Sequence, residues 1–285
     1  MNLLRKDDFK NKKIKSFIED KYNIHSAIIL NNIGRPIYEF VDDEKEIKKC
    51  RFCNKTENDV TFDHKAHVVP KFLGNFLVLS NSECDECNSY FSKFETELEK
   101  YIKIPLIANK QGKYLKNRYG QNIKRIGEEI IVNGKQEVVE FNGLFVLKIF
   151  LKFAYSLLNE NELKFYDNIK NILLDDTSIP HITNILDITS NEPFDWNSVV
   201  LYDKKIENKE YVDNIIVMNF NMKKYIVFFN KDNHKNELTE DIIRNEYLKL
   251  FTDTDIFNYR IRNLEHDQHI KFNIDIFMEL IKNSF

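Results

Sequence analysis

All four cysteines of the chain stand in two pairs, Cys50 with Cys53 and Cys84 with Cys87, and two residues separate the members of each pair. Two thiolates at this spacing can hold one metal ion from a tight turn, and two such turns complete a tetrahedral site. A redox motif needs only one pair, so it does not account for the second. The spacing therefore predicts a structural zinc ion with four sulfur ligands and no position open to substrate.

The stretch between the two cysteine pairs is 30 residues long, which is more than a plain zinc ribbon requires. A zinc ion would fix the ends of this loop and make short, otherwise marginal strands rigid. Residues 61–70 (TFDHKAHVVP) are β-prone up to Pro70, which ends a strand. After a bend at Gly74 comes a second apolar run, and residues 89–102 carry apolar side chains at helical spacing. The expected order is therefore strand, bend, strand and helix.

The residues in this order resemble the zinc-binding branch of the HNH endonuclease family, which has the ββα-metal fold. The resemblance is carried by Cys50 and Cys53, by AHVVP at residues 66–70, by LGN at residues 73–75 and by ECDECN at residues 83–88. It covers about 50 of the 285 residues, and the fragments are specific only in combination. It implies a metal-dependent endonuclease that hydrolyses phosphodiester bonds in DNA.

The resemblance also implies roles for individual side chains. His67 matches the family's first histidine, the general base that takes a proton from the attacking water. Asn88 follows the last cysteine directly, at the position of a helix residue that binds the catalytic divalent ion. Asn81 matches the asparagine that orients the histidine ring, with Asn75 as the alternative for that role. The implied cofactors are structural Zn²⁺ and catalytic Mg²⁺ or Mn²⁺, the latter acting on the phosphate as a Lewis acid.

Ala66 departs from the family pattern, because many HNH enzymes have an acidic or histidine metal ligand just before the general base. Side chains alternate along a strand, so His64 would share a face with Ala66, about 6.5 Å away. His64 is therefore a candidate replacement for the missing ligand, and Asp63 and Glu83 are alternatives if the chain bends locally. The second interpretation is a zinc-stabilised module that binds nucleic acid but has lost catalysis. The absence of a metal ligand at Ala66 would indicate that loss.

Charge along the chain is compatible with a nucleic-acid partner. Residues 1–125 hold 24 basic and 18 acidic residues, a balance of +6, whereas residues 126–285 have a balance of −9. Basic charge attracts phosphate without reading sequence, although an ordinary solvated surface explains the same balance equally well. Lys65, Lys71 and Lys93 lie near the expected site and are candidates for phosphate contacts. The predicted partner is DNA, with RNA as an alternative because a ββα site does not itself select the sugar.

This interpretation divides the chain into three parts, and the predicted fold class is α+β. They are a helix and hairpin extension at residues 1–45, the small zinc-bound ββα-metal (HNH) module at residues 46–105 and a larger α+β domain of unknown role at residues 106–285.

Hydrophobic periodicity predicts the elements outside the module. In the extension, residues 10–22 are expected to form a helix, and residues 27–30 and 36–40 a hairpin around Gly34. In the larger domain, helices are expected at residues 143–158, 162–174, 241–250 and 274–282, and strands at residues 199–202, 214–219 and 225–229.

The helix expected at residues 143–158 is apolar apart from a narrow stripe of Lys148, Lys152 and Ser156. We expect this stripe to be a solvated edge, with contact to nucleic acid as the alternative. The two lysines also interrupt the longest apolar stretch of the chain, so no membrane-spanning helix is expected.

The first residues contain no apolar run of signal-peptide length, which favours a cytoplasmic protein. The acidic balance of the larger domain argues against a main DNA-binding surface there. The remaining roles for this domain are self-association into a homo-oligomer and sensing of a signal. A nuclease with such an additional domain is similar, by analogy alone, to bacterial defence effectors.

Overall fold

The computed structural model describes fourteen stretches of the 285 residues. These are residues 21–30, 39–40, 47–74, 78–107, 115–116, 122–126, 129–132, 138–189, 197–205, 211–220, 223–232, 238–247, 258–266 and 269–271. They contain both helices and strands, which confirms the α+β fold class.

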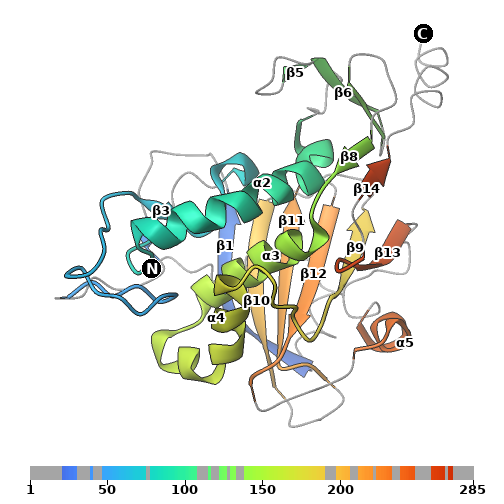
Figure 1. The fold of residues 1–285 in the computed structure, drawn as a ribbon. Helices are drawn as coiled ribbons and strands as arrows, with labels where there is room; N and C mark the ends of the chain where they lie inside the picture. The colour runs from blue at the N-terminus through green and yellow to red at the C-terminus, as the bar shows by residue number, and fades with distance from the viewer. Residues whose placement is uncertain are drawn as a thin grey trace.

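A six-stranded antiparallel sheet forms the centre of the larger part, in the order β1-β10-β11-β12-β9-β13 (Figure 1). Its second, third and fourth strands confirm the strands expected at residues 199–202, 214–219 and 225–229. The bounds are Tyr22–Leu30 for β1, Asn197–Lys204 for β10, Asn214–Phe220 for β11, Lys223–Phe229 for β12, Asn184–Thr189 for β9 and Asn258–Asn263 for β13.

Both faces of this sheet are apolar. In β11, Ile216 and Met218 belong to the core shared with the helices, whereas Ile215 and Val217 belong to a second core on the other face. The two sets alternate because successive side chains of a strand point to opposite faces. A short helix, α5 (Glu240–Ile242), continues as a π-helical turn at Ile243–Tyr247 and packs with the second core.

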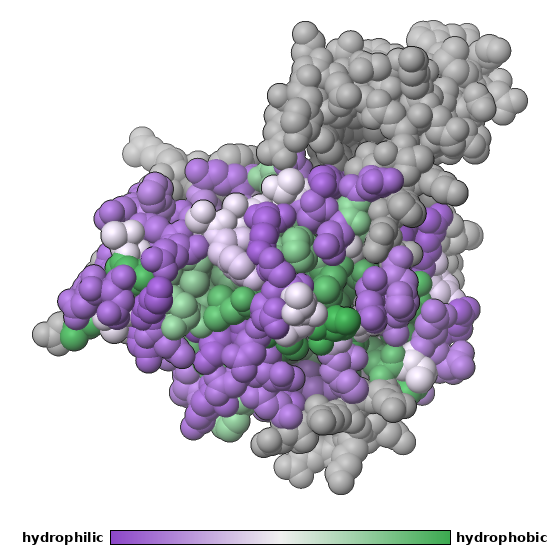
Figure 2. Space-filling model, viewed as in Figure 1, coloured by the Kyte–Doolittle hydropathy of each residue, from purple (hydrophilic) through white to green (hydrophobic). Residues whose placement is uncertain are grey.

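Three helices lie together on one side of the sheet (Figure 1). They are α2 (Asp85–Ile107), α3 (Gly143–Leu157) and α4 (Asp167–Leu174). Helix α3 packs against α2, α4 and β12, and its N-terminus is capped by the Asn142 side chain, which accepts from the Phe145 amide. Hydrophilic residues cover most of this face, and hydrophobic ones show mainly in a band across its middle (Figure 2).

The loop between the cysteine pairs folds as expected into two short strands before a helix. Strand β3 (Ala66–His67) pairs antiparallel with β4 (Val78–Ser80), and a 3-10 turn at Lys71–Leu73 lies between them. Gly74 ends that turn with φ of 96°, a left-handed conformation that glycine adopts without steric cost. The ββα order predicted from the sequence is therefore confirmed, and helix α2 starts earlier than expected, at Asp85.

The remaining described strands form two small sheets. One has three strands, β5 (Leu115–Lys116), β6 (Asn122–Ile126) and β7 (Glu129–Val132). The other pairs β8 (Val138–Glu140) with β14 (His269–Lys271). None of the helices in the described stretches has the length and apolarity needed to cross a membrane.

The expected hairpin of residues 27–40 is wrong. Strand β1 pairs with β10 in the large sheet, and β2 (Glu39–Phe40) pairs in parallel with β4 of the module. Each strand thus found a long-range partner that local turn signals do not reveal. The division into three parts stays a prediction, although β1 shows that the expected extension contributes to the large sheet.

Two expected helices also differ. The helix at residues 162–174 is divided into a 3-10 helix, η3 (Glu160–Phe165), and α4, with Tyr166 between them. The helix at residues 241–250 is described only to Tyr247. Of the helix expected at residues 10–22, residues 10–20 lie outside the described residues, and Tyr22 begins strand β1. The helix expected at residues 274–282 lies outside the described residues.

The stripe of Lys148, Lys152 and Ser156 is the clearest correction, because all three residues are buried and not a solvated edge. Helix α3 is covered by α2 on one side and by the sheet and α4 on the others, so it has no solvent-facing stripe at these positions. The ammonium groups of both lysines find partners within the protein instead: the Asp175 carbonyl for Lys148, and Glu83 and the His67 carbonyl for Lys152.

Candidate metal centre and active site

The four cysteine sulfurs form one cluster in which every ligand atom lies within 4.8 Å of the others. The sulfurs of Cys53 and Cys84 are 3.7 Å apart, and none of the four cysteines is in a disulfide. Four sulfurs bound at about 2.3 Å to a tetrahedral ion lie about 3.8 Å from one another. The cluster therefore fits a zinc ion, as the cysteine spacing predicts.

Local backbone geometry brings the two pairs together. The amide of Asn54 donates to the Cys50 carbonyl at 2.9 Å and the amide of Cys50 to the Lys55 carbonyl at 2.8 Å, which closes the first turn. Asn54 has φ of 62°, a left-handed conformation that asparagine tolerates better than most residues. The second pair lies at the start of α2, where the positive end of the helix favours thiolates.

The thiols perturb one another strongly. A hydrogen bond from Cys87 lowers the pKa of Cys50 to about 5, whereas burial raises the pKa of Cys84 to about 12. The pKa of Cys87 is raised, first by its hydrogen bond to Cys50 and then by burial. One sulfur therefore ionises readily at the expense of its neighbours, and a divalent cation is what allows all four to be thiolates at once.

The first cysteine turn is anchored to helices α2 and α3. Phe52 packs its ring edge-on against Phe91, with centroids 4.7 Å apart, and lies 5.5 Å from the Tyr155 ring. Arg51 donates from Nη1 to the carbonyls of Tyr155 and Ser156 at 3.0 and 2.7 Å. A cation at the C-terminus of α3 complements the free carbonyls and the helix dipole. Nothing in the sequence around Arg51 indicates which helix it would cap.

His67, the expected general base, lies on β3 opposite Leu79 and is half-buried. Its Nδ1 atom is buried and makes no hydrogen bond with the described residues. Burial, reinforced by the charges of Lys71 and Lys152, lowers the pKa of His67 to about 4. The imidazole is therefore neutral near pH 7, as a general base must be before it takes a proton, but the same lowering of the pKa weakens its basicity.

Glu83 and Lys152 form a fully buried ion pair beside this strand. Their side chains are 0 % exposed, and Nζ of Lys152 lies 2.9 Å from Oε2 of Glu83. The same ammonium donates to the backbone carbonyl of His67 at 3.2 Å. Burial raises the pKa of Glu83 against the lowering effect of Lys152, and burial also raises the pKa of Glu95. Glu83 is thus engaged by a lysine and is a poor replacement for the ligand missing at Ala66.

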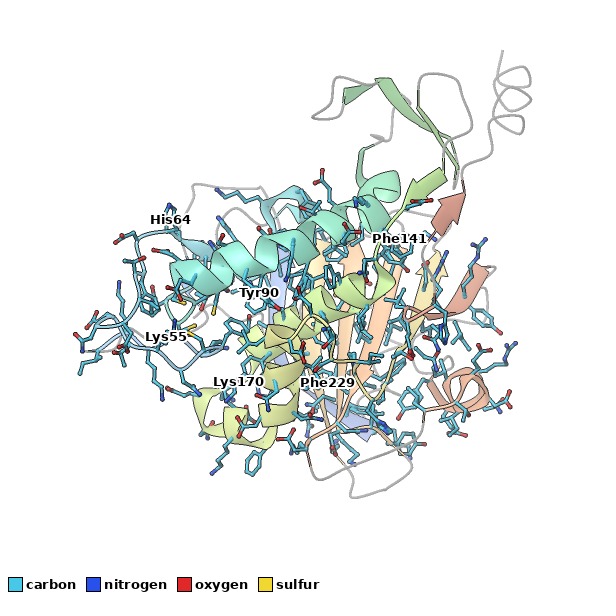
Figure 3. The ribbon with its side chains drawn as sticks, viewed as in Figure 1. Lys55, His64, Tyr90, Phe141, Lys170 and Phe229 are labelled. Atoms are coloured by element: carbon cyan, nitrogen blue, oxygen red, sulfur yellow. The ribbon has the colours of Figure 1, made fainter. Side chains whose placement is uncertain are left out.

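His64 lies in a bend and not on β3, so the expectation that it shares a strand face with Ala66 is wrong. Its imidazole is 79 % exposed, with Nδ1 3.3 Å from Oδ1 of Asp85 (Figure 3). The amides of Asp63 and His64 donate to the two carboxylate oxygens of Asp85. The first residue of α2 therefore fixes this loop, and a metal-binding role of His64 stays a prediction.

The asparagines lie at the expected places, but their roles stay predictions. Asn81 follows β4 and is half-buried, yet the orienting hydrogen bond to Nδ1 of His67 is absent among the described residues. Asn75 lies outside the described residues. Asn88 is in the first turn of α2, where its amide donates to the Cys84 carbonyl at 2.9 Å.

The three candidate phosphate contacts differ. Lys65 and Lys71 are exposed, and Lys71 is close enough to His67 to affect its pKa. Lys93 instead binds both carboxylate oxygens of Asp176 at 2.5 and 2.6 Å and lies 3.8 Å above the Tyr90 ring centroid. Its ammonium is therefore paired with Asp176 at the surface, and a phosphate contact of Lys93 stays a prediction.

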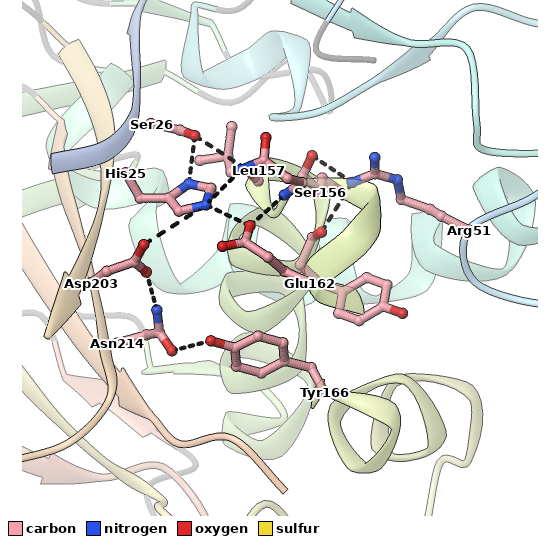
Figure 4. A network of polar contacts seen from close by, with 11 residues as sticks. His25, Ser26, Arg51, Ser156, Leu157, Glu162, Tyr166, Asp203 and Asn214 are labelled. Atoms are coloured by element: carbon pink, nitrogen blue, oxygen red, sulfur yellow. Dashed lines mark hydrogen bonds and ion pairs between the residues drawn. The ribbon is translucent and has the colours of Figure 1, made fainter. Parts of the chain in front are cut away.

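A second polar cluster lies where β1, η3 and β10 meet (Figure 4). Nε2 of His25 is 2.7 Å from Glu162 and 3.8 Å from Asp203. The shorter distance is that of a charge-assisted hydrogen bond. Glu162 also completes a capping box with Asn159, so an ion pair and a helix cap explain its position. An ion pair and hydrogen bonds therefore account for the position of His25.

A comparison with known protein families identifies the same segment of the chain. No curated protein and no solved structure gives a significant match to the chain. The model of the family described as HNH endonuclease matches residues 50–102, which run from the first cysteine into α2. This stretch holds all four clustered cysteines, the β3 histidine and the helix that follows them. Residues 50–102 of this chain therefore belong to the HNH endonuclease family.

Proposed function

We propose that the chain is a metal-dependent endonuclease that hydrolyses phosphodiester bonds in DNA. The observation that carries this proposal is a neutral His67 on the first strand of a ββα module whose four cysteine sulfurs are clustered. A neutral imidazole takes the proton of a water molecule as that water attacks phosphorus. The structural zinc ion has no open position and only holds the scaffold.

The catalytic cation would depend on few protein ligands. Among the described residues, no group of three His, Cys, Asp or Glu side chains gathers at His67. Asn88 and, as an alternative, His64 would hold Mg²⁺ or Mn²⁺ together with phosphate oxygens, in keeping with the small number of protein ligands that Mg²⁺ accepts. When bound, the ion supplies charge neutralisation at the phosphate.

Phosphate contacts would come from Lys65 and Lys71, which are exposed in the segment that carries His67. These point charges attract the backbone of DNA and do not read its sequence. We place the activity in bacterial defence by analogy with nucleases that carry an additional domain, and assign self-association to the larger part.

The test is cleavage of supercoiled plasmid by the full chain with Mg²⁺ or Mn²⁺, for the wild type and His67→Ala. We expect nicking by the wild type and a rate about 10²–10⁴ times lower for the variant, because the base is lost. Parallel digestion of DNA and RNA identifies the preferred substrate, and faster loss of RNA would contradict the assignment to DNA.

A nucleic-acid-binding module without catalysis is the second candidate. Ala66 is fully buried and has no ligand atom to offer, while Glu83 is paired with Lys152. Equal nicking by the two proteins, or none by either together with DNA binding, would favour this second function.

A further inference from the structure

Lys152 belongs to α3, far from the HNH segment in sequence, yet its side chain ends inside the module. It is 0 % exposed, and its ammonium lies 5.7 Å from the ring centroid of Phe91 in α2. The ammonium contacts two groups of the loop between the cysteine pairs: the carboxylate of Glu83 at 2.9 Å and the backbone carbonyl of His67 at 3.2 Å.

The place of the ammonium is set by Glu83, which immediately precedes Cys84 at the second cysteine turn. Both side chains are removed from water, so neither can exchange its partner for solvent without a large cost. The position of the lysine is thus fixed relative to the metal centre, and the lysine transmits that position to the strand that carries the general base.

Strand β3 is short: it comprises Ala66 and His67 and pairs with β4 at two positions. Next to it, the Val68 amide donates to the Val78 carbonyl at 3.3 Å, and the Val68 side chain is buried in the core. A change of about 1 Å at a catalytic group can cost about 10²-fold in rate. The buried ammonium on the His67 carbonyl adds a contact from α3 at the residue whose side chain must face the phosphate.

We propose that Lys152 is a positioning residue for His67: it anchors the backbone of the general base to helix α3. This inference rests on the proposed nuclease function. It makes the larger part of the chain necessary for the geometry of the site, because the anchor comes from α3.

The chain offers a matched control on the same helix. Lys148 lies one turn earlier on α3 and is also 0 % exposed, but its ammonium donates to the Asp175 carbonyl and not to the module. Replacing either lysine by methionine keeps a similar length and removes one buried cation. Only the change at Lys152 removes the contact with His67.

The experiment compares Lys152→Met, Lys148→Met and the double variant Glu83→Met with Lys152→Met in the full chain. The readouts are Tm, zinc content, and kcat and KM for plasmid cleavage. The double variant exchanges the whole ion pair for apolar side chains, which restores stability in comparable buried pairs. We expect kcat of both Lys152 variants to fall at least about tenfold, with KM within about twofold, because a buried lysine cannot touch DNA.

We expect Lys148→Met to lower Tm and leave kcat within about twofold, and zinc content to stay at one ion per chain throughout. Return of wild-type kcat in the double variant, once Tm recovers, would show a merely structural pair and overturn the proposal. An equal loss of kcat in Lys148→Met would do the same. If the wild type does not cut, or cuts without His67, the nuclease function itself fails, and the positioning role with it.

Discussion

The HNH module and the six-stranded sheet are held together in different ways. In the module the paired strands have two and three residues, whereas β10, β11 and β12 have eight, seven and seven. The sheet buries apolar side chains on both faces. Strands as short as β3 and β4 are not stable alone, so the module depends on its metal centre and on packing against α2 and α3.

The module also depends more than the sheet on individual polar contacts. Two buried cations connect the module to α3, Arg51 from the module to the helix and Lys152 from the helix to the module. Each contact is directional, so the position of the module depends on a few atoms. The interior of the sheet depends on many interchangeable apolar contacts and tolerates small losses. The candidate active site lies in the part that is easier to disturb.

Removal of one sulfur should have the largest effect. We expect Cys84→Ser to release the metal, unfold residues 50–101 and abolish DNA binding and cleavage, because structural zinc contributes about 10–16 kcal/mol in small zinc domains. Hydrogen exchange should show loss of protection in the module and retention in β10–β12. Near-native Tm together with full metal content would contradict a four-cysteine site.

A cavity in the sheet should have a smaller effect. Ile216 is fully buried in the core shared with the helices, and we expect Ile216→Ala to lower the free energy of unfolding by about 2–5 kcal/mol. Urea denaturation measures the loss. Metal content and cleavage below the unfolding transition should match the wild type, and metal release from this variant would show that the two parts are not separable in this way.

Of the three changes, lowering the pH to about 5 should have the smallest effect. The pKa of His67 is about 4, below the ordinary 6.5, so we expect cleavage to be constant from pH 8 to about 5 and to fall with a midpoint near 4. Because the unfolded chain binds this proton more tightly, the stability that His67 contributes is complete above about pH 6.5 and is lost as the pH falls through 4. A cleavage midpoint near 6.5 at unchanged metal content would contradict a buried base.

The module was predictable because its signals are local. Two cysteine pairs, a histidine before a proline and a helical run together indicated the ββα order, and the clustered sulfurs, the short strands and α2 agree with it. The expected hairpin of residues 27–40 failed for the opposite reason. Its two halves pair with β10 and β4, and nothing in their own sequence identifies such distant partners.

The stripe on α3 shows the same limit at single side chains. Helical spacing correctly placed Lys148 and Lys152 on one face, but it did not reveal what covers that face. A lysine on an apolar helix usually reaches water, and only the packing of α2 over α3 shows that both are buried. The ion pair of Lys152 with Glu83 was missed for this reason.

The sequence by itself indicated the four metal-binding cysteines and the ββα order, because both depend on residue types a few positions apart. Only the tertiary structure decided the contacts of the module with the rest of the chain: Lys152 of α3 donates to the His67 carbonyl and forms a buried ion pair with Glu83. Lys152 lies far from both residues in the sequence. Their contacts arise from the packing of helices and strands that local residue patterns do not encode.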